Sequence, residues 1–154
     1  PRRVALIERG RHAASLVSPR TAREFGLVSN GASESEVPQS LRVARGSLPA
    51  RNALARLGDG IAVSNLWYLN WSDRAAGRVT GMTRFACLRI EGGEPVAPIE
   101  AMRFDDSIYR LFGDALEALG DAPARLPADD TYEARAVGGT EAPSALISAL
   151  RFTL

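Results

Sequence analysis

The sequence predicts an α+β fold made mainly of antiparallel β-sheet, in a sandwich or barrel-like arrangement, with a few short helices and one longer helix. The segment 60–103 carries the first signal. Three of its runs are rich in apolar, β-branched and aromatic residues and are separated by turn residues, as in an antiparallel meander. The segment 107–119 carries the second signal, because its apolar residues recur at helical spacing. Together these two segments predict the fold class.

Short elements are expected before the meander. A helix should begin at Pro19, because Ser18 is a good N-cap and proline suits the first helical position. It should run to Phe25, where Gly26 ends it. Alanine and leucine at helical spacing predict a second helix over 50–57. The other predicted elements are strands over 4–8, 11–17 and 41–44, a turn-rich loop over 30–39, and a C-cap at Gly58.

The first run of the meander, 61–71, contains both tryptophans of the chain. We expect this run to anchor the core, with Trp67 or Tyr68 substantially buried. The second run covers 79–90. The glycine pair at 92–93 then predicts a tight hairpin turn, because glycines supply the positive φ that such turns need.

The third run, 95–102, contains two prolines, which cannot donate to a ladder. This strand is therefore expected at an edge or paired on one side only. The longer helix follows over 107–119, with Asp106 placed to cap its first turn and Gly120 to end it. The remaining predicted segments are a proline-rich linker over 121–130 and a last apolar strand over 145–154.

Composition limits the class of protein. The chain has 154 residues, is 45% hydrophobic and 24% charged, and has a net charge of +1, which fits one globular domain over 1–154. The near-zero charge argues against direct binding of nucleic acid, and no apolar run is long enough to cross a membrane. The single cysteine excludes an internal disulfide and favours a reducing, cytoplasmic compartment. A start at Pro1 rather than Met favours a fragment of a longer polypeptide, with a processed start as the alternative.

Few residues offer catalytic or metal-binding chemistry. His12 is the only histidine, and a partly exposed strand residue explains it better than a metal ligand or general base, because metal sites need several converging ligands. Cys87 has no histidine placed to activate its thiol, so a small buried residue is favoured. Asp105 and Asp106 could form an acid–base pair or bind a hard cation, but capping by Asp106 is favoured. No catalytic or metal-ligating residue is predicted.

The aromatic residues of the first run offer a possible binding surface. Strict alternation divides this strand into two faces, with Trp67, Leu69 and Trp71 on one and Leu66, Tyr68 and Asn70 on the other. One face must be core, and the other could line a cleft with residues of the second run. Core packing of both faces is the alternative. The candidate substrate- or partner-binding residues are Tyr68, Thr80, Met82, Arg84 and Arg103.

Four stretches in this order resemble one known family: GxxVSNLWYLN, TGMTRFACLRIEGGE, VAPIEAMRF and DDSIYRLFGDALEALG. They look like the C-terminal half of the TldD/PmbA proteins, once called modulators of DNA gyrase and now regarded as zinc metallopeptidases and their partners. The resemblance runs from about residue 4 to residue 154 and is strongest over 58–120. It implies a role in the proteolysis of unfolded or linear peptides.

The zinc-binding members of this family carry a helical H-E-x-x-x-H motif and a late cysteine. The motif lies upstream of the part that this chain resembles, and the stretch expected to hold the cysteine, 134–141 (ARAVGGTE), contains none. The chain therefore resembles the non-zinc subtype, TldE or PmbA. The resemblance implies a zinc-bearing TldD-like partner subunit, with zinc in that subunit or in an upstream domain and none in this chain. Two alternatives stay open, a plain protein-interaction module and a gyrase-linked regulator.

Overall fold

The computed structural model describes residues 3–129, 131, 135 and 137–153. Residue contacts divide the chain into two units. The first consists of Pro1–Arg42 and Arg125–Glu141, and the second of Val43–Ala124 and Ala142–Leu154. The sheets are mostly antiparallel and the helices short, as the sequence predicts. The described strands form open sheets and do not close into a barrel.

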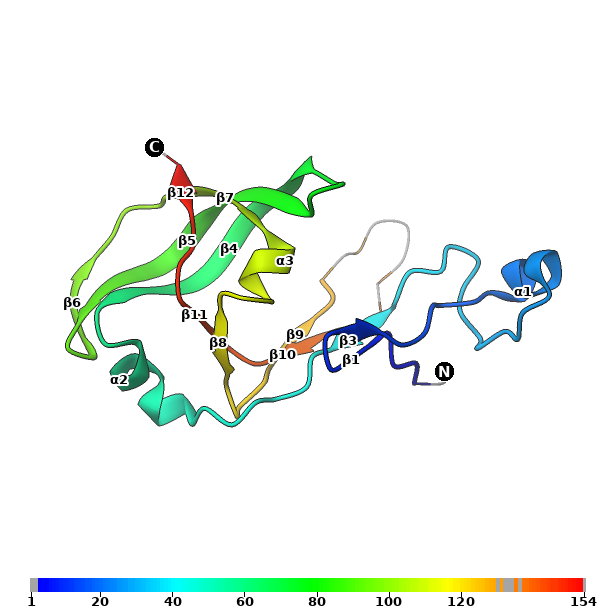
Figure 1. Ribbon diagram of the computed structural model, residues 1–154, viewed down its shortest axis with the longest axis horizontal. Coiled ribbons are helices and arrows are strands. Elements are labelled where there is room, and N and C mark those ends of the chain that lie inside the picture. Colours follow the sequence, from blue (N-terminus) through cyan, green and yellow to red (C-terminus); the bar gives the residue numbers. More distant parts are fainter. Residues whose placement is uncertain (1–2, 130, 132–134, 136, 154) are drawn as a thin grey trace. The chain divides into compact units, whose positions relative to one another are not determined.

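The first unit is made of short elements (Figure 1). Its best-defined element is the helix α1, Pro19–Phe25, whose bounds match the prediction. The Thr21 amide donates to the Ser18 hydroxyl at 3.2 Å, and Gly26 ends the helix at φ 65°. Three strands are shorter than predicted, and the third also begins one residue earlier: β1 Ile7–Glu8, β2 Arg11–His12 and β3 Ser40–Arg42. The sequence does not predict β9, Ala124–Pro127, or β10, Gly139–Ala142, and β9 lies in the segment predicted as a linker. The strand β10 runs parallel to β3, and β1 runs antiparallel to β2.

The predicted loop over 30–39 contains no helix or strand, and it is tied to the start of α1. The Glu36 carboxylate accepts a hydrogen bond from the Ser18 amide at 2.7 Å. This bond, with a second from the Thr21 side chain, holds the pKa of Glu36 below its ordinary value. The loop therefore contributes an acceptor to the amide end of the helix, where negative charge is favoured.

The second unit is organised around one sheet with the order β12–β7–β5–β4. Its central strand β5, Arg78–Glu91, pairs along its length with β4, Gly60–Asp73. On its other side β5 pairs first with β7, Arg103–Ser107, and then with β6, Glu94–Pro98. Figure 1 shows β4 and β5 as two long strands side by side. The predicted meander is confirmed, and β6 pairs on one side only, as its prolines require.

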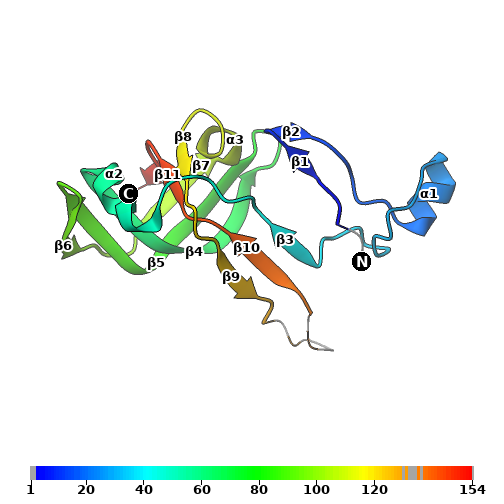
Figure 2. The same cartoon turned by 90° about the horizontal axis from the view of Figure 1, so that it is seen from below.

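The turn between β5 and β6 is formed by the glycine pair that predicts it. Gly92 and Gly93 have φ of 57° and 85°. The Gly93 amide donates to the Gly58 carbonyl at 2.8 Å, and a Cβ on Gly93 would lie 2.8 Å from the Cα of Ala55. Ala55 belongs to α2, Ala53–Leu57, which follows the 3-10 helix η1, Ala50–Asn52, and lies beside this turn in Figure 2. The helix predicted over 50–57 is thus confirmed.

The longer helix predicted over 107–119 is wrong. The structure has only one helical turn there, α3, Ile108–Leu111, followed by turns and by the strand β8, Leu116–Leu119. Gly113 is packed so closely that a Cβ would lie 2.4 Å from the Tyr109 carbonyl oxygen. After this turn the chain pairs antiparallel with β11, Ala145–Ile147. A non-local strand partner therefore overrides a local helical pattern.

The single strand predicted over 145–154 is also wrong, because two short strands, β11 and β12 (Phe152–Thr153), occur there. The break between them is held by Asp106. Its carboxylate accepts from the Arg151 amide at 3.0 Å, while Arg110 donates to the Ala149 carbonyl at 2.8 Å. These bonds replace the strand pairing that residues 148–151 would otherwise need.

The core of the second unit is formed by residues of β5, β7, α3 and the turn that follows α3. Its buried apolar residues are Cys87, Ile90, Phe104, Leu111 and Ala115. The predicted burial of Trp67 or Tyr68 is wrong, because these side chains are 54% and 70% exposed. Among the described residues, no helix has both the length and the apolar character needed to cross a membrane.

Candidate functional site

The strand β4 contains a β-bulge at Tyr68. Trp67 lies opposite Met82 and Asn70 lies opposite Thr80, so Tyr68 and Leu69 together face the single residue Gly81. Tyr68 has φ 57°, the left-handed conformation that glycine usually supplies at the first position of such a bulge. A bulky residue held there stores strain, and such strain is concentrated at functional sites.

The bulge changes which residues share a face, so the predicted alternation of β4 is wrong. Trp67 shares a face with its cross-strand neighbour Met82. Leu69 points to the opposite face, because a Cβ on Gly81 would lie 2.7 Å from Leu69 Cδ2 and 3.0 Å from the buried ring of Phe104. One extra residue moves every later side chain to the other face. We call the side of Trp67 and Met82 the outer face.

A second bulge lies in β5 at Phe85. Val63 pairs with Cys87 and Asn65 with Arg84, so Phe85 and Ala86 both face Ser64. Phe85 has φ 61° and its ring is 72% exposed. The Ser64 hydroxyl donates to the Arg84 carbonyl at 3.2 Å and spans the interrupted ladder. Two aromatic residues in strained conformations thus lie on neighbouring strands.

Arg84 lies between these two bulges along the hairpin. The Cζ of its half-buried guanidinium is 4.2 Å from the centroid of the Trp67 ring and 4.7 Å from that of Phe85. Both distances fit cation–π contacts. In the part of the chain that the structure describes, no carboxylate pairs with Arg84. The rings therefore hold this charge in place without neutralising it.

Four of the five candidate residues line one pocket on the outer face. Its volume is about 270 Å³, and it is lined by Tyr68, Asn70, Thr80, Gly81, Met82 and Arg103. Arg103 is brought there by β7, where it lies opposite Met82. Arg84 does not line this pocket but lies two residues from Met82 along the same face. Sequence reasoning missed Gly81 as part of the site, and only the register of β5 against β4 reveals it.

The side chains of Asp105 and Asp106, which are adjacent in β7, point to opposite faces of the sheet. Asp105 pairs with Arg78 at 2.5 Å, beside Thr80. Asp106 points into the interior, is 0% exposed, and accepts from the Arg110 side chain and from the Ser107 and Arg151 amides. The hydrogen bond from Arg110 holds the pKa of Asp106 at about 2, below its ordinary value of 3.8. They form no acid–base pair, and Asp106 acts as a buried ion-pair partner.

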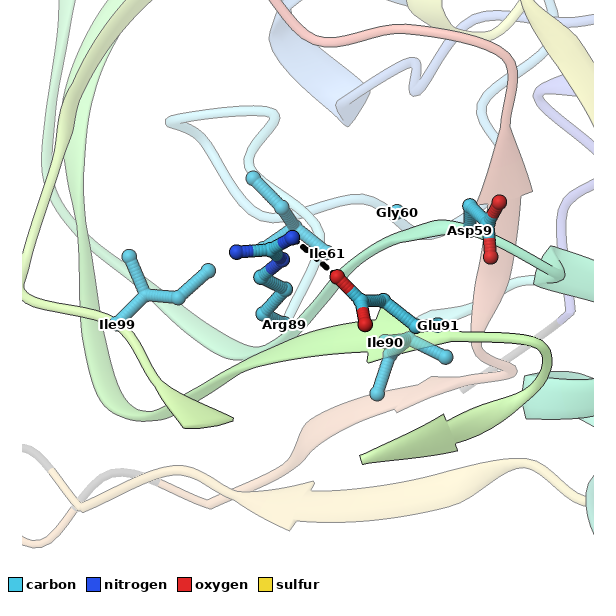
Figure 3. Close-up of a pocket in the computed structure, with 7 residues that line it drawn as sticks. All are labelled: Asp59, Gly60, Ile61, Arg89, Ile90, Glu91 and Ile99. Atoms are coloured by element: carbon cyan, nitrogen blue, oxygen red, sulfur yellow. Dashed lines mark hydrogen bonds and ion pairs between the residues drawn. The ribbon is translucent and has the colours of Figure 1, made fainter. Parts of the chain in front are cut away.

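A second pocket, of about 590 Å³, lies at the other end of β5 (Figure 3). Arg89 and Glu91 line this pocket and form an exposed ion pair, and Ile61 and Ile99 also line it. Asp59 lies apart from that pair and accepts from the Gly92 amide at 2.6 Å, which stabilises the β5–β6 turn. The charged groups of this pocket already have hydrogen-bond partners within the protein. We therefore place the candidate site at the outer face, beside the two bulges.

The described residues do not fit a zinc site. No three histidine, cysteine, aspartate or glutamate side chains among them gather in a way that could hold a metal ion. His12 is exposed and lies 3.1 Å from the Ser15 hydroxyl, and Cys87 is buried with its Sγ 3.9 Å from the Arg84 carbonyl. Residues 134 and 136, in the stretch where the resemblance expects a cysteine, lie outside the described residues.

The outer edge of β4 completes the site. Within the described ranges, β4 pairs with β5 alone, so its other edge carries unpaired backbone groups over 14 residues. The residues along its second half include large exposed hydrophobics: Leu66, Trp67, Tyr68, Leu69 and Trp71. A long apolar edge strand of this kind is a template for pairing with another chain.

The sequence matches a family model described as the PmbA/TldA metallopeptidase C-terminal domain over residues 1–154. The chain belongs to this family. The match covers both units and agrees with the resemblance carried by the meander. By its description, the TldD/PmbA family is one of metallopeptidases. No curated protein matches the sequence significantly.

Two solved structures share the fold of this TldD/PmbA domain. TldE from Thermococcus kodakarensis has a TM-score of 0.76 at 15% identity, over 97% of this chain and 33% of that one. A putative modulator of a DNA gyrase from Thermotoga maritima has a TM-score of 0.72 at 17% identity, over 96% and 32%. The chain thus spans about a third of the length of these proteins.

Proposed function

We propose that the chain serves as the C-terminal domain of a non-zinc subunit in a TldD/PmbA-type metallopeptidase, where it helps to hold unfolded or linear peptides for hydrolysis. The free edge of β4, with its exposed aromatic residues, is the observation that carries this proposal. An extended peptide can add to such an edge as a further strand. Its main-chain hydrogen bonds supply affinity with little preference for sequence.

The bulge at Tyr68 gives this edge a defined end. Regular pairing between β4 and β5 runs from Asn65 to Trp67 and stops at the bulge. A peptide strand laid along this segment meets the exposed Tyr68 ring and the pocket behind it. The pocket has an apolar wall at Met82 and a guanidinium at Arg103, so it can accept part of a peptide side chain. Folded substrates are disfavoured, because most folded proteins protect their edge strands from pairing with another chain.

The assignment to the non-zinc subtype rests on the donor set. The described residues gather no three metal ligands, and the sequence 134–141 lacks the cysteine that the resemblance expects. The zinc is then expected in a TldD-like partner subunit or in an upstream domain. A subunit without metal can still raise activity, because correct positioning of a substrate lowers the barrier independently of the metal. We expect this complex to act in the cytoplasm.

A plain interaction module is the second candidate function. The same exposed edge and aromatic residues fit a surface that another protein covers permanently, without contact to any substrate. Direct binding of DNA is not favoured, because the net charge is only +1. Peptide binding separates the first two functions.

The test is to purify the intact protein with a zinc-bearing TldD-like protein from the same source. Size-exclusion chromatography should show a complex, and the mixture should hydrolyse an unfolded peptide faster than the partner alone. A peptide methylated on its backbone nitrogens is the matched control, because it cannot pair as a strand. A partner equally active alone, with no complex formed, would contradict the proposal. A complex that binds no peptide would favour the interaction module.

A further inference from the structure

We propose that Arg84, held by Trp67 and Phe85, recognises the carboxylate of an acidic side chain in the peptide that pairs with β4. This inference rests on the proposed function and adds a preference to it. Strand addition alone is indifferent to side chains, whereas a fixed guanidinium beside the edge is not. The site therefore prefers extended peptides that carry glutamate or aspartate near this position.

The stacking geometry is the first support. Arg84 Cζ lies 4.2 Å from the centroid of the Trp67 ring and 4.7 Å from that of Phe85, and a guanidinium at such distances typically stacks with its plane against the ring. The N–H donors lie in that plane and point away from the stacked faces. Among the described residues, none accepts a hydrogen bond from the Arg84 side chain. A planar guanidinium with open donors matches a carboxylate in bidentate geometry.

The place of Arg84 relative to the free edge is the second support. The guanidinium lies over the ring of Trp67, which belongs to β4 itself. A peptide strand added to β4 would lie about 4.8 Å beyond it. A glutamate on the outer face of that peptide, beside Trp67, can therefore reach the guanidinium. Arg103 lies two strands away from the edge, on β7, and is therefore farther from the added strand than Arg84.

The charges around Arg84 are the third support. The carboxylate of Asp105 on the neighbouring strand is engaged by Arg78 at 2.5 Å, and Asp106 is buried with Arg110. Neither is available to neutralise Arg84. The half-buried guanidinium is also screened less by salt than an exposed one would be. An incoming carboxylate thus meets a positive charge that is already oriented, which lowers the entropy cost of binding.

The strained backbone of Phe85 is the fourth support. Its φ of 61° turns the ring out at the bulge, and the ring lies against Arg84. Without the bulge, Phe85 would follow the strand alternation and point to the face opposite Arg84. The strained conformation thus places a second aromatic ring against the guanidinium of Arg84.

The experiment compares labelled peptides by fluorescence anisotropy on the intact protein. Both peptides are acetylated and amidated, and they differ only in a central Glu or Gln. We expect the Glu peptide to bind about fivefold more tightly, which is ~1 kcal/mol, the size of a partly exposed charge-assisted pair. Arg84→Gln should remove the difference in affinity. Arg84→Glu should bind the Glu peptide less tightly than the Gln peptide, and should bind a third peptide with a central Lys most tightly. Arg74→Gln, in the exposed β4–β5 turn, should keep the wild-type preference.

The outcomes separate this inference from the proposed function. Binding of the Gln peptide to wild type and to Arg84→Gln with equal affinity supports strand addition by itself. A Glu preference that survives Arg84→Gln overturns the role of Arg84. The role would also be overturned if a Gln peptide with a free C-terminus bound as tightly as the amidated Glu peptide. The site would then recognise the terminal carboxylate of the peptide and not an acidic side chain. Failure of every peptide to bind contradicts the proposed function instead.

Discussion

Tyr68 and Phe85 both occupy a left-handed backbone conformation at a β-bulge, where glycine would cost less. Each residue costs on the order of 1–2 kcal/mol in that conformation. Their rings are largely exposed, so burial of apolar surface does not offset this cost. Residues that stay in a strained conformation, with no burial of their side chains to offset the cost, are candidates for a role in binding.

Replacing Tyr68 with asparagine should therefore stabilise the protein. Asparagine tolerates the left-handed conformation better than tyrosine, and the lost ring contacts little, so we expect a gain of roughly 0.5–1 kcal/mol in the free energy of unfolding. Urea denaturation measures it. Tyr68→Phe keeps both the ring and the strain and should leave stability unchanged. A loss of stability in Tyr68→Asn would show that the ring packs more than its exposure indicates.

Asp106 is a residue on which the stability of the second unit depends. Its buried carboxylate accepts bonds from Arg110, Ser107 and Arg151, and so joins β7, α3 and the segment before β12. Asp106→Asn would leave Arg110 without its counter-charge and should cost about 3 kcal/mol. Asp105→Asn breaks only a partly exposed pair with Arg78 and should cost less than ~1 kcal/mol. Thermal unfolding of the two variants measures the difference.

The same carboxylate should set part of the pH dependence. Its pKa falls from 3.8 to about 2 on folding, so the ionised form stabilises the native state above pH 4. This contribution, ~2 kcal/mol for a shift of that size, should be lost as the pH falls from about 4 to about 2. The stability difference between wild type and Asp106→Asn should shrink over that window. A constant difference would contradict the low pKa.

Among the elements, those with their own local signals were predictable from the sequence. Ser18, Pro19 and Gly26 set the bounds of α1, and the glycine pair 92–93 sets the β5–β6 turn. The helix over 107–119 was not, because its apolar spacing fits two structures and a distant partner, β11, decides between them. The site was predictable as a set of residues on β4, β5 and β7. Its faces were not, because no local signal marks tyrosine at a bulge.

The β5–β6 turn offers a matched pair of glycines. Gly93→Ala should cost at least about 2 kcal/mol, because its Cβ would meet the backbone of Ala55 at 2.8 Å in addition to the unfavourable φ. Gly92→Ala faces open space and should cost only ~1 kcal/mol from φ alone. Chemical denaturation of both variants measures the difference. Equal costs would mean that α2 moves away from the turn without penalty.

At the scale of the whole molecule, the described part of the chain exposes apolar and charged groups that no other described residue covers. The bulged outer face and the edge of β4 are a surface without a partner in the described part of the chain. The chain also spans about a third of the length of TldE from Thermococcus kodakarensis. An exposed edge of this kind is a template for pairing with a peptide, with another part of the same protein or with another subunit.

The location of the zinc decides whether the edge of β4 serves its own subunit or a partner subunit. We expect the intact protein alone to retain no stoichiometric zinc after dialysis, because it resembles the non-zinc subtype and because residues 1–154 have one histidine, one cysteine and no described cluster of three ligands. Under the proposed function, zinc should appear when the protein is purified together with a zinc-bearing TldD-like protein. Metal analysis of each preparation by mass spectrometry measures this.

His12→Ala is the control for that measurement, because a histidine ligand is the residue that zinc in this chain would most need. The variant should leave the metal content of the paired complex unchanged, since the side chain of His12 is exposed and, among the described residues, hydrogen-bonds with Ser15 alone. Stoichiometric zinc in the protein alone that disappears in His12→Ala would overturn the assignment to the non-zinc subtype. Zinc in the protein alone that survives this substitution would place the ligands outside residues 1–154 but on the same chain. The edge of β4 would then hold peptide for its own subunit, not for a partner.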